Sequence, residues 1–388
     1  MFTVILVYLV LAGLLWAYLL RESFVTFRRD ITLKANGEVN FPDHPPTVTI
    51  MVPARDEEHN IRECVDALLA QDYPNVEVIV ANDRSSDQTA EIVREMCAEH
   101  PRLRLVEVHD LPEGWTGKNN ALHTAVHEAQ GDYFVFTDAD TRHVPSCISQ
   151  CMNHVLANGL DMLSLVGQMD HRTLWEKMFV PPIAATLMLW FQQKHVNDRN
   201  CHVAFANGQY ILISREMYEK CGGHERVRHE LLEDIAMAKE AKGEGGHINL
   251  AYGGELYSAR MYDSFGDFFR GWSRILHSGL EKDPWRLLLQ WVLTALFSIC
   301  PFVVVLMGTI GVAAGADGAL PCLVLSIAVC ALIIWSVSRT YPISKSKRRY
   351  ALLHPINCLV ILAVLAHAFY TAATGSGIVW RGTVYSSK

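Results

Sequence analysis

Hydrophobic residues along this chain form long, uncharged runs at both ends and short runs in a more polar middle. Residues 2–20 carry no charge and are numerous enough to cross a bilayer as one helix. Three further runs cover residues 287–315, 320–337 and 352–374. A cleaved signal peptide is the alternative for the first run, but it would have a shorter apolar core and a small-residue cleavage site. The pattern favours an N-terminal transmembrane anchor at residues 1–21, a C-terminal transmembrane region of about three segments at residues 286–375, and a tail at residues 376–388.

The middle of the chain alternates between short β-rich runs and longer segments with helical spacing. The runs at residues 47–53, 76–81, 103–108 and 133–137 are typical of buried strands. Between them, residues 57–70, 86–100 and 118–130 have the spacing of helices. This alternation predicts an α/β fold, a mostly parallel sheet with flanking helices, in a domain that covers residues 30–285. Ligands of such sheets bind beyond the carboxyl ends of the strands.

The second half of this middle domain is less regular. Residues 229–242 have helical spacing. Residues 179–193 are apolar and aromatic, contain two prolines, and are short for a membrane span. Two interpretations of that segment stay open, a helix in the protein core and an interfacial helix that rests on the bilayer.

Basic residues cluster beside the apolar runs. One cluster follows the first run and the other lies between the last two runs, and together they comprise Arg21, Arg28, Arg29, Lys34, Arg339, Lys345, Lys347, Arg348 and Arg349. Since loops rich in Lys and Arg tend to stay in the cytoplasm, the sequence predicts an integral inner or cell membrane protein with a cytoplasmic middle domain. Counting alternate crossings puts the tail outside, unless one C-terminal segment is re-entrant or lies along the interface.

Composition argues against two classes of site. The net charge is −7, and the middle domain has no long basic run, which argues against nucleic acid as a partner. The ten cysteines include no Cys-x-x-Cys pair. Cys147 and Cys151 are able to share a helix face, but no His follows at ligand spacing. Free thiols in a reducing compartment are therefore favoured over a zinc site.

A first acidic motif follows the first predicted strand, at residues 53–58 (Pro-Ala-Arg-Asp-Glu-Glu). A carboxylate such as that of Glu57 can accept hydrogen bonds from a base or ribose, and Arg55 can meet a phosphate. Pro53, Arg55 and Glu57 are therefore candidate contacts of a nucleotide. The alternative, that the acidic residues only cap the next helix, stays open.

A second acidic motif, at residues 82–87, ends the second predicted strand. Its first carboxylate, Asp83, is placed to hold a base or ribose at the edge where ligands bind. For Asp87 we favour a role as the N-cap of the following helix.

The third motif, Thr-Asp-Ala-Asp at residues 137–140, gives the strongest chemical signal. Asp138 and Asp140 stand at alternate positions at the end of a strand, where they can place oxygens around one Mg²⁺ or Mn²⁺ together with a diphosphate. Either carboxylate could instead cap a helix near Pro145, but the preceding strand favours metal binding.

Two adjacent carboxylates, Glu233 and Asp234, lie within the helical pattern of residues 229–242. A carboxylate that faces a pocket can remove a proton from an acceptor hydroxyl as the nucleophile forms. Asp234 stands between Leu232 and Ile235, which favours a partly buried role. Glu233 has a solvated alternative, a place on an exposed helix face with Lys239 and Lys242 as partners.

Two basic motifs complete the candidate chemistry. Gly114-Trp-Thr-Gly-Lys118 precedes a helix, so its backbone N–H groups and Lys118 can meet a phosphate, although it lacks Walker A spacing. Within residues 269–274, Arg270, Trp272 and Arg274 can clamp a diphosphate or stack on a sugar. An aromatic and basic stripe just before a membrane span is also an ordinary interfacial anchor.

Taken together and in this order, the motifs resemble those of the inverting family 2 glycosyltransferases, which have a GT-A fold. The match extends over about residues 45–285 and includes residues 53–58, 82–87, 117–118, 137–140, 207–208 and 233–234. With the N-terminal span, the Gly-Trp-Thr-Gly-Lys motif, residues 196–198 and a C-terminal Trp-Arg-Gly-x-x-Tyr, the chain is similar to membrane-bound transferases associated with carotenoid, hopanoid and ceramide-type lipids.

The resemblance implies a role for several of these residues. Asp83 would contact the nucleoside, Asp138 and Asp140 the diphosphate and a Mg²⁺ or Mn²⁺ ion, and Asp234 would be the base. The implied donor is a nucleotide-diphosphate sugar, with a UDP-sugar favoured. We therefore expect metal-dependent, inverting transfer of one sugar to a lipid or lipid-like acceptor at the cytoplasmic membrane face.

The chain departs from the family pattern in two places. Asn82 stands where many relatives have a second Asp, and residues 267–272 occupy the region of the Gln-x-x-Arg-Trp motif of processive synthases, which is absent. Processive polymer synthesis is therefore disfavoured. Two alternatives stay open, transfer to a polyprenyl phosphate and a non-catalytic membrane scaffold with a vestigial nucleotide pocket.

Overall fold

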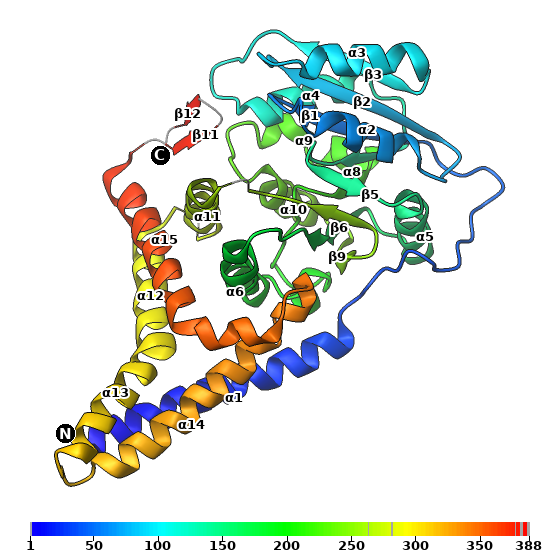
Figure 1. The fold of residues 1–388 in the computed structure, drawn as a ribbon. Helices are drawn as coiled ribbons and strands as arrows, with labels where there is room; N and C mark the ends of the chain where they lie inside the picture. The colour runs from blue at the N-terminus through cyan, green and yellow to red at the C-terminus, as the bar shows by residue number, and fades with distance from the viewer. Residues whose placement is uncertain (1, 263, 281, 377, 381–382, 386–388) are drawn as a thin grey trace. The chain divides into compact units, whose positions relative to one another are not determined.

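The computed structural model describes residues 2–262, 264–280, 282–376, 378–380 and 383–385, and within it the chain forms two compact units. The α/β unit comprises residues 30–170 and 191–261, and the helical unit comprises residues 1–29, 171–190 and 262–388 (Figure 1). Residues 171–190 and 262–285 thus group with the terminal helices. The functional boundary at residue 285 stays a prediction.

The α/β unit is built on a seven-stranded sheet with the strand order β3-β2-β1-β4-β8-β6-β9. The strands are β1 (Val48–Ala54), β2 (Val76–Asp83), β3 (Leu103–Val108), β4 (Tyr133–Phe136), β6 (Met162–Val166), β8 (Ile211–Ser214) and β9 (Ile248–Tyr252). The first four run parallel, as do β6 and β9, whereas β8 is antiparallel to both of its neighbours. The expected α/β fold with a mostly parallel sheet is confirmed, and the one reversed strand lies in the less regular half.

Helices flank this sheet (Figure 1), and the same unit contains a separate three-stranded sheet. The helices are α2 (Ile61–Leu69), α3 (Thr89–Glu99), α4 (Gly117–Glu128), α5 (Cys147–Asn158), α7 (Gln193–Val196), α8 (Arg215–Lys220), α9 (Gly223–Arg226) and α10 (Glu233–Gly243). The small sheet has the order β5 (Thr141–His143), β10 (Tyr257–Ala259) and β7 (Gln168–Met169). The sequence did not predict these three short strands.

The core of the α/β unit lies between the sheet and its helices. Strand residues such as Ile50, Val52 and Val80 are fully buried and pack in one cluster with Val65 and Leu68 of α2. Strands covered on both faces need apolar side chains at nearly every position, which is why they read as continuous apolar runs in the sequence.

The helical unit contains the apolar runs of both chain ends. Its elements are α1 (Phe2–Arg29), α6 (Leu174–Trp190), α11 (Phe265–Gly279), α12 (Pro284–Thr294), η1 (Ala295–Ile299), α13 (Cys300–Ala313), α14 (Ala319–Ser338), η2 (Tyr341–Ser344), η3 (Arg348–Leu353) and α15 (His354–Thr374). Among the residues that the structure describes, four stretches are long and apolar enough to cross a membrane, namely Phe2–Phe24, Pro284–Ala313, Ala319–Ser344 and Arg348–Thr374. Within the unit, α14 packs against α1 and α13, and α15 packs against α11 and α12.

Two further segments of this unit had been identified in the sequence, residues 179–193 and the C-terminal tail. Residues 179–193 are helical as far as Trp190, in α6, which packs against α15. Within the predicted tail, β11 (Ile378–Trp380) pairs with β12 (Thr383–Tyr385), while residues 377, 381–382 and 386–388 lie outside the described residues. The side chains of Arg28 and Arg29 also lie outside the described part of the chain.

Candidate active site

Three of the acidic motifs meet at one edge of the sheet. Strands β2 and β4 both pair with β1 in parallel. One acidic motif stands at the carboxyl end of each of these three strands. Because parallel strands end at the same edge, the loops at residues 55–60 and 84–88 and the loop at residues 137–140 lie at the carboxyl ends of the sheet, as predicted.

Hydrogen bonds tie the first two loops to each other. The carboxylate of Asp56 accepts from the backbone N–H of Ser86 at 2.8 Å, and the N–H of Glu58 donates to Asp87 at 2.9 Å. Asp87 also accepts from the N–H of Thr89 at 3.0 Å, at the start of α3. Asp87 therefore bonds the first N–H of α3, but the N-cap residue is Gln88, one position later than predicted. Asp56 holds the left-handed backbone conformation that this loop requires, with φ +54°.

Asp83 is the buried carboxylate at the centre of this edge. Its Oδ1 accepts from Arg84 Nε at 2.8 Å, and its Oδ2 lies 3.9 Å from Arg55 Nη1. A Cβ on Gly117 would collide with Asp83 Oδ2, so glycine is needed where α4 begins. The next-door Asn82 donates to Glu107 at 2.6 Å, while its buried Oδ1 has no hydrogen-bond partner among the described residues.

Pro53 and Glu57, the other two predicted nucleotide contacts of the first motif, lie in β1 and in the loop that follows it. Pro53 lies in β1 opposite Ala81 of β2. Glu57 accepts from the Asn60 side chain at 2.9 Å, and its N–H donates to Thr89 at 2.8 Å. Glu57 thus has contacts that shape the loop, and its predicted contact with a nucleotide stays a prediction.

Lys118 connects the loop after β4 with helix α10. Its Nζ lies 2.7 Å from Asp138 Oδ1 and 2.7 Å from Glu233 Oε1. Burial alone would lower the pKa of this ammonium group, but the carboxylates of Asp138 and Glu233 outweigh burial and raise it. The motif that contains Lys118 opens α4 with Thr116 as N-cap, whose hydroxyl accepts from the N–H of Asn119 at 3.3 Å. Lys118 is therefore charged in this cluster.

Asp234 is held in the same cluster by backbone donors. Its Oδ2 accepts from the N–H of Gly208 at 2.7 Å, and its Oδ1 accepts from the N–H of Ile235 at 2.8 Å. Burial and the neighbouring carboxylate of Glu233 raise the pKa of Asp234 to about 7, against the opposing effect of Lys118 and the two N–H groups. A carboxylate with a pKa near neutrality is suited to general base catalysis.

Gly208 marks the point at which these groups converge. A Cβ on this residue would lie 3.1 Å from Asp234 Oδ2, 3.1 Å from Lys118 Nζ and 3.4 Å from Glu233 Oε1. Three predicted site residues from two distant parts of the sequence therefore surround one glycine. The sequence had pointed to Gly208 only through the family resemblance.

A buried polar network lies behind the loop after β4, and no sequence argument had identified it. His143 of β5 contacts the Thr137 hydroxyl at 3.0 Å, and that hydroxyl donates to the carbonyl of Gln209 at 2.8 Å. His143 also stacks on Tyr257 of β10, whose hydroxyl accepts from the side chain of Asn207 at 3.0 Å. Burial lowers the pKa of His143 to about 3, so the ring is neutral. The network joins the loop of Asp138 to the turn that holds Asp234.

The carboxylates of Asp138 and Asp140 fit a metal ion that takes most of its ligands from substrate phosphates and water. The described residues contain no group of three or more His, Cys, Asp or Glu side chains arranged to hold a metal. Mg²⁺ is commonly bound by one or two carboxylates together with substrate phosphates and water. Two carboxylates on one loop meet that requirement, and metal binding at Asp138 and Asp140 stays a prediction. All ten cysteines are free thiols.

The remaining predicted donor contacts, Arg270, Trp272 and Arg274, lie on α11 in the helical unit. Arg270 pairs with Asp267 at 2.8 Å and is exposed. Trp272 is buried, and its indole N–H has no hydrogen-bond partner among the described residues. Their role toward a donor stays a prediction.

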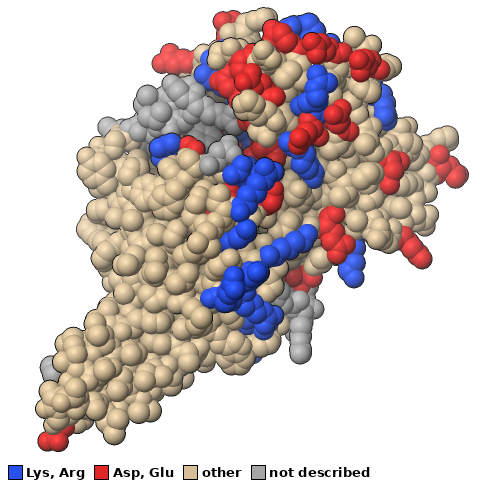
Figure 2. Space-filling model, viewed as in Figure 1, with Lys and Arg blue, Asp and Glu red and all other residues tan. Residues whose placement is uncertain are grey.

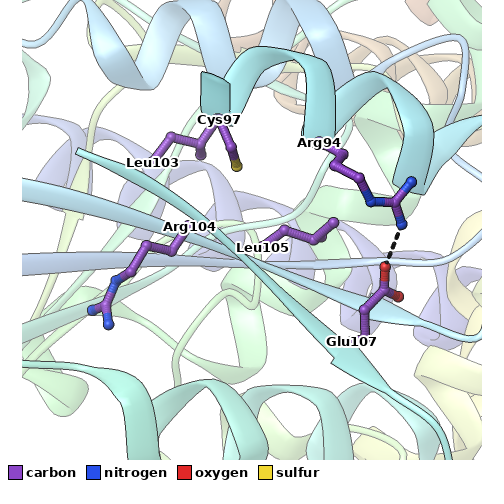
Figure 3. A pocket seen from close by; sticks show the side chains of 6 residues that line it. All are labelled: Arg94, Cys97, Leu103, Arg104, Leu105 and Glu107. Atoms are coloured by element: carbon purple, nitrogen blue, oxygen red, sulfur yellow. Dashed lines mark hydrogen bonds and ion pairs between the residues drawn. The ribbon is translucent and has the colours of Figure 1, made fainter. Parts of the chain in front are cut away.

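One shallow pocket lies elsewhere, at the edge strand β3. Figure 3 shows its lining from α3 and β3, with the guanidinium of Arg94 paired to Glu107 at 2.9 Å. Arg104, Cys97 and two leucines complete the lining. This pocket lacks the adjacent carboxylates and backbone donors of the loop cluster, which makes the cluster around Gly208 the candidate active site.

Comparison with known proteins agrees with this fold. Residues 49–222 match the model of glycosyl transferase family 2. Over 263 residues the chain is 29% identical to 4,4'-diaponeurosporenoate glycosyltransferase of Staphylococcus aureus (strain USA300). The alignment covers 65% of this chain and 66% of that protein, so it spans slightly under two thirds of the relative's length. A mannosyltransferase from Pyrobaculum calidifontis, solved in complex with GDP-Man and Mn²⁺, is 18% identical, with a TM-score of 0.54 over 96% of this chain and 99% of that one. The expected GT-A fold is confirmed.

Proposed function

We propose, from the match of residues 49–222 to the model of glycosyl transferase family 2 and from the GT-A fold, that the protein transfers one sugar from a nucleotide-diphosphate sugar to a lipid or lipid-like hydroxyl. The transfer inverts the anomeric carbon and depends on Mg²⁺ or Mn²⁺. The observation that carries the proposal is the cluster in which Lys118 bridges Asp138 and Glu233 while Gly208 holds Asp234.

Asp234 acts as the general base in this proposal. Its carboxylate takes the proton of the acceptor hydroxyl, and the acceptor oxygen attacks the anomeric carbon on the side opposite the leaving group. The new glycosidic C–O bond forms as the C–O bond to the diphosphate breaks, and the nucleotide diphosphate leaves. A pKa of about 7 keeps Asp234 largely ionised above neutral pH while leaving it basic enough to accept the proton.

The other residues of the cluster bind and orient the donor. Asp138 and Asp140 would hold Mg²⁺ or Mn²⁺, which supplies positive charge for the departing diphosphate. Lys118 adds a second positive charge beside Asp138. Asp83 contacts the nucleoside, flanked by Arg55.

A lipid acceptor is supported by two independent observations. The described residues include four helices long and apolar enough to cross a membrane, and the similar protein of S. aureus is named 4,4'-diaponeurosporenoate glycosyltransferase. The basic clusters favour a cytoplasmic α/β unit. A polyprenyl phosphate acceptor would need no strong base, so the raised pKa of Asp234 favours a hydroxyl acceptor.

Transfer of label tests this function. Membranes that contain the protein are incubated with a panel of radiolabelled UDP- and GDP-sugars and Mn²⁺ or Mg²⁺, and label in the lipid extract is measured. We expect label from one donor to reach the organic phase only with metal and with intact Asp140, so Asp140→Ala is the matched variant. Folded, membrane-bound protein that moves no label from any donor would contradict the proposal and favour the non-catalytic scaffold.

A further inference from the structure

The segment between α14 and α15 presents four cations to solvent. In this connecting loop, residues 339–353, the side chains of Lys345, Lys347, Arg348 and Arg349 are all exposed. None of the four forms an ion pair with a described residue; Arg349 only approaches the ring of Tyr350, at 5.7 Å. Four unpaired positive charges within five residues are unusual in a chain whose net charge is −7.

The connecting loop is fixed in place by two buried residues, one before the cations and one among them. Tyr341 is fully buried; its hydroxyl donates to the carbonyl of Met178 at 3.2 Å and accepts from the Asn357 side chain at 2.9 Å. The N–H of Ser346, itself buried, donates to the carbonyl of Tyr341 at 2.9 Å. Because Tyr341 and Ser346 point into the unit, the cations beside them are held outward on a structured scaffold.

Exposed apolar side chains stand next to these cations. Ile343 is 41% exposed and Leu352 is 66% exposed, while Trp335, in the last turns of α14, is 55% exposed. One candidate span, Ala319–Ser344, ends at this point and the next, Arg348–Thr374, begins there. Cations together with an aromatic side chain at the ends of spans are typical of the membrane–water interface. Figure 2 shows Lys and Arg side chains gathered beside the charge-poor surface of the apolar helices.

We infer that the connecting loop binds anionic phospholipid headgroups of the bilayer. The four cations face the negatively charged headgroups, and Ile343 and Leu352 enter the adjoining acyl region. A free nucleotide or phosphate would use the cations but would leave these two side chains without an apolar partner. The inference does not depend on the proposed transferase activity, since it rests only on the helical unit.

Lipid retention by the purified full-length protein tests the inference. The protein in neutral detergent is incubated with equimolar phosphatidylglycerol and phosphatidylcholine, washed on an affinity resin, and the retained lipids are quantified by mass spectrometry. We expect the wild-type protein to retain phosphatidylglycerol in preference, less so at high salt because screening weakens surface charge interactions. Basic loops also help to set the orientation of a protein as it inserts into a membrane. Because the protein is already purified in detergent, that effect does not influence which lipid it retains.

Substitution of the cations gives the decisive comparison. We expect Lys345→Gln, Lys347→Gln, Arg348→Gln and Arg349→Gln together to abolish the preference, and the pair Lys347→Gln and Arg349→Gln to reduce it, by roughly two- to fivefold for each cation removed. A matched control removes four exposed cations of the α/β unit by Arg62→Gln, Arg94→Gln, Lys220→Gln and Arg226→Gln, and keeps the preference. An unchanged ratio in the fourfold loop variant, an equal loss in the control, or displacement of the lipid by millimolar inorganic phosphate or UDP would overturn the inference.

Discussion

At the scale of single residues, the proposed transfer depends on the raised pKa of Asp234. Its carboxylate is partly buried beside Glu233, and both effects disfavour its charged form. The backbone N–H of Gly208 fixes one of its oxygens. Two acidic neighbours in the sequence thus take different roles, because Glu233 pairs with Lys118 and Asp234 does not.

The pH dependence of transfer follows from this arrangement. Because the pKa of Asp234 is raised to about 7, kcat/KM is expected to fall as pH drops through neutrality and the base becomes protonated. Glu233→Gln removes a negative neighbour, so it lowers the pKa of Asp234 and moves the acid limb of the profile to lower pH. An acid limb that moves to higher pH, or that stays at the same pH, would contradict the electrostatic coupling between Glu233 and Asp234.

A glycine substitution tests the convergence point without changing any charge. In Gly208→Ala the new Cβ would lie 3.1 Å from both Asp234 Oδ2 and Lys118 Nζ, so these groups must shift. We expect kcat to fall, because the base must move by a few tenths of an ångström, but by less than the roughly 100-fold loss that a displacement of about 1 Å causes. Gly243→Ala on α10 is the control, since a Cβ there meets no atom within 4 Å. Equal activity of the two variants would show that the turn at Gly208 does not position the base.

At the scale of elements, the strands and helices with a local sequence pattern were predicted. The short strands that form only by pairing with distant segments were not. The strands β1 to β4 are apolar runs that alternate with segments of helical spacing, so these strands, the strand end at Asp83 and the loop that carries Asp138 were predictable. Strands β5, β7 and β10 have three residues or fewer and include polar side chains. His143 and Tyr257 lie on two of these strands, more than one hundred residues apart in sequence, so no local signal could bring them together.

The network at His143 is expected to link stability with turnover. Tyr257→Phe leaves the N–H of Gly167 and the amide of Asn207 without their hydroxyl partner. We expect a loss of about 1–3 kcal/mol in the free energy of unfolding, together with a lower kcat because the turn at Gly208 is less well held. Denaturant unfolding and initial rates measure both effects. Tyr133→Phe serves as control, since the hydroxyl of Tyr133 makes no hydrogen bond with a described residue, and a control as damaged as Tyr257→Phe would refute the link.

The loop after β4 is expected to set the metal requirement. Chelation should abolish transfer and Mn²⁺ should restore it, because the leaving diphosphate needs positive charge. Asp138→Ala and Asp140→Ala should raise the Mn²⁺ concentration that gives half-maximal rate, whereas Asp43→Ala, at an exposed site outside the motifs, should not. Full activity in the presence of chelator would remove the metal from the mechanism.

At the scale of the whole molecule, charge and hydropathy predict orientation in the membrane. The spans at Pro284–Ala313 and Ala319–Ser344 are joined by a short segment that contains the exposed Asp317. The positive clusters predict that this segment lies on the side of the membrane opposite the α/β unit. A membrane-impermeant thiol reagent should therefore label Asp317→Cys in intact cells and label Asp43→Cys only after lysis. The native cysteines give little background, since none is fully exposed, and the reverse labelling pattern would invert the orientation.

The central claim, that Asp234 is the base of a glycosyl transfer, is tested most directly by Asp234→Asn. Donor affinity is measured by calorimetry and transfer by initial rate, with the donor found in the label panel. We expect donor binding close to that of the wild-type protein and transfer reduced by about 10²–10⁴-fold, the usual contribution of a general base. Glu240→Gln on the same helix should leave both quantities unchanged. Transfer by Asp234→Asn at a rate near that of the wild-type protein, with donor binding intact, would contradict the account.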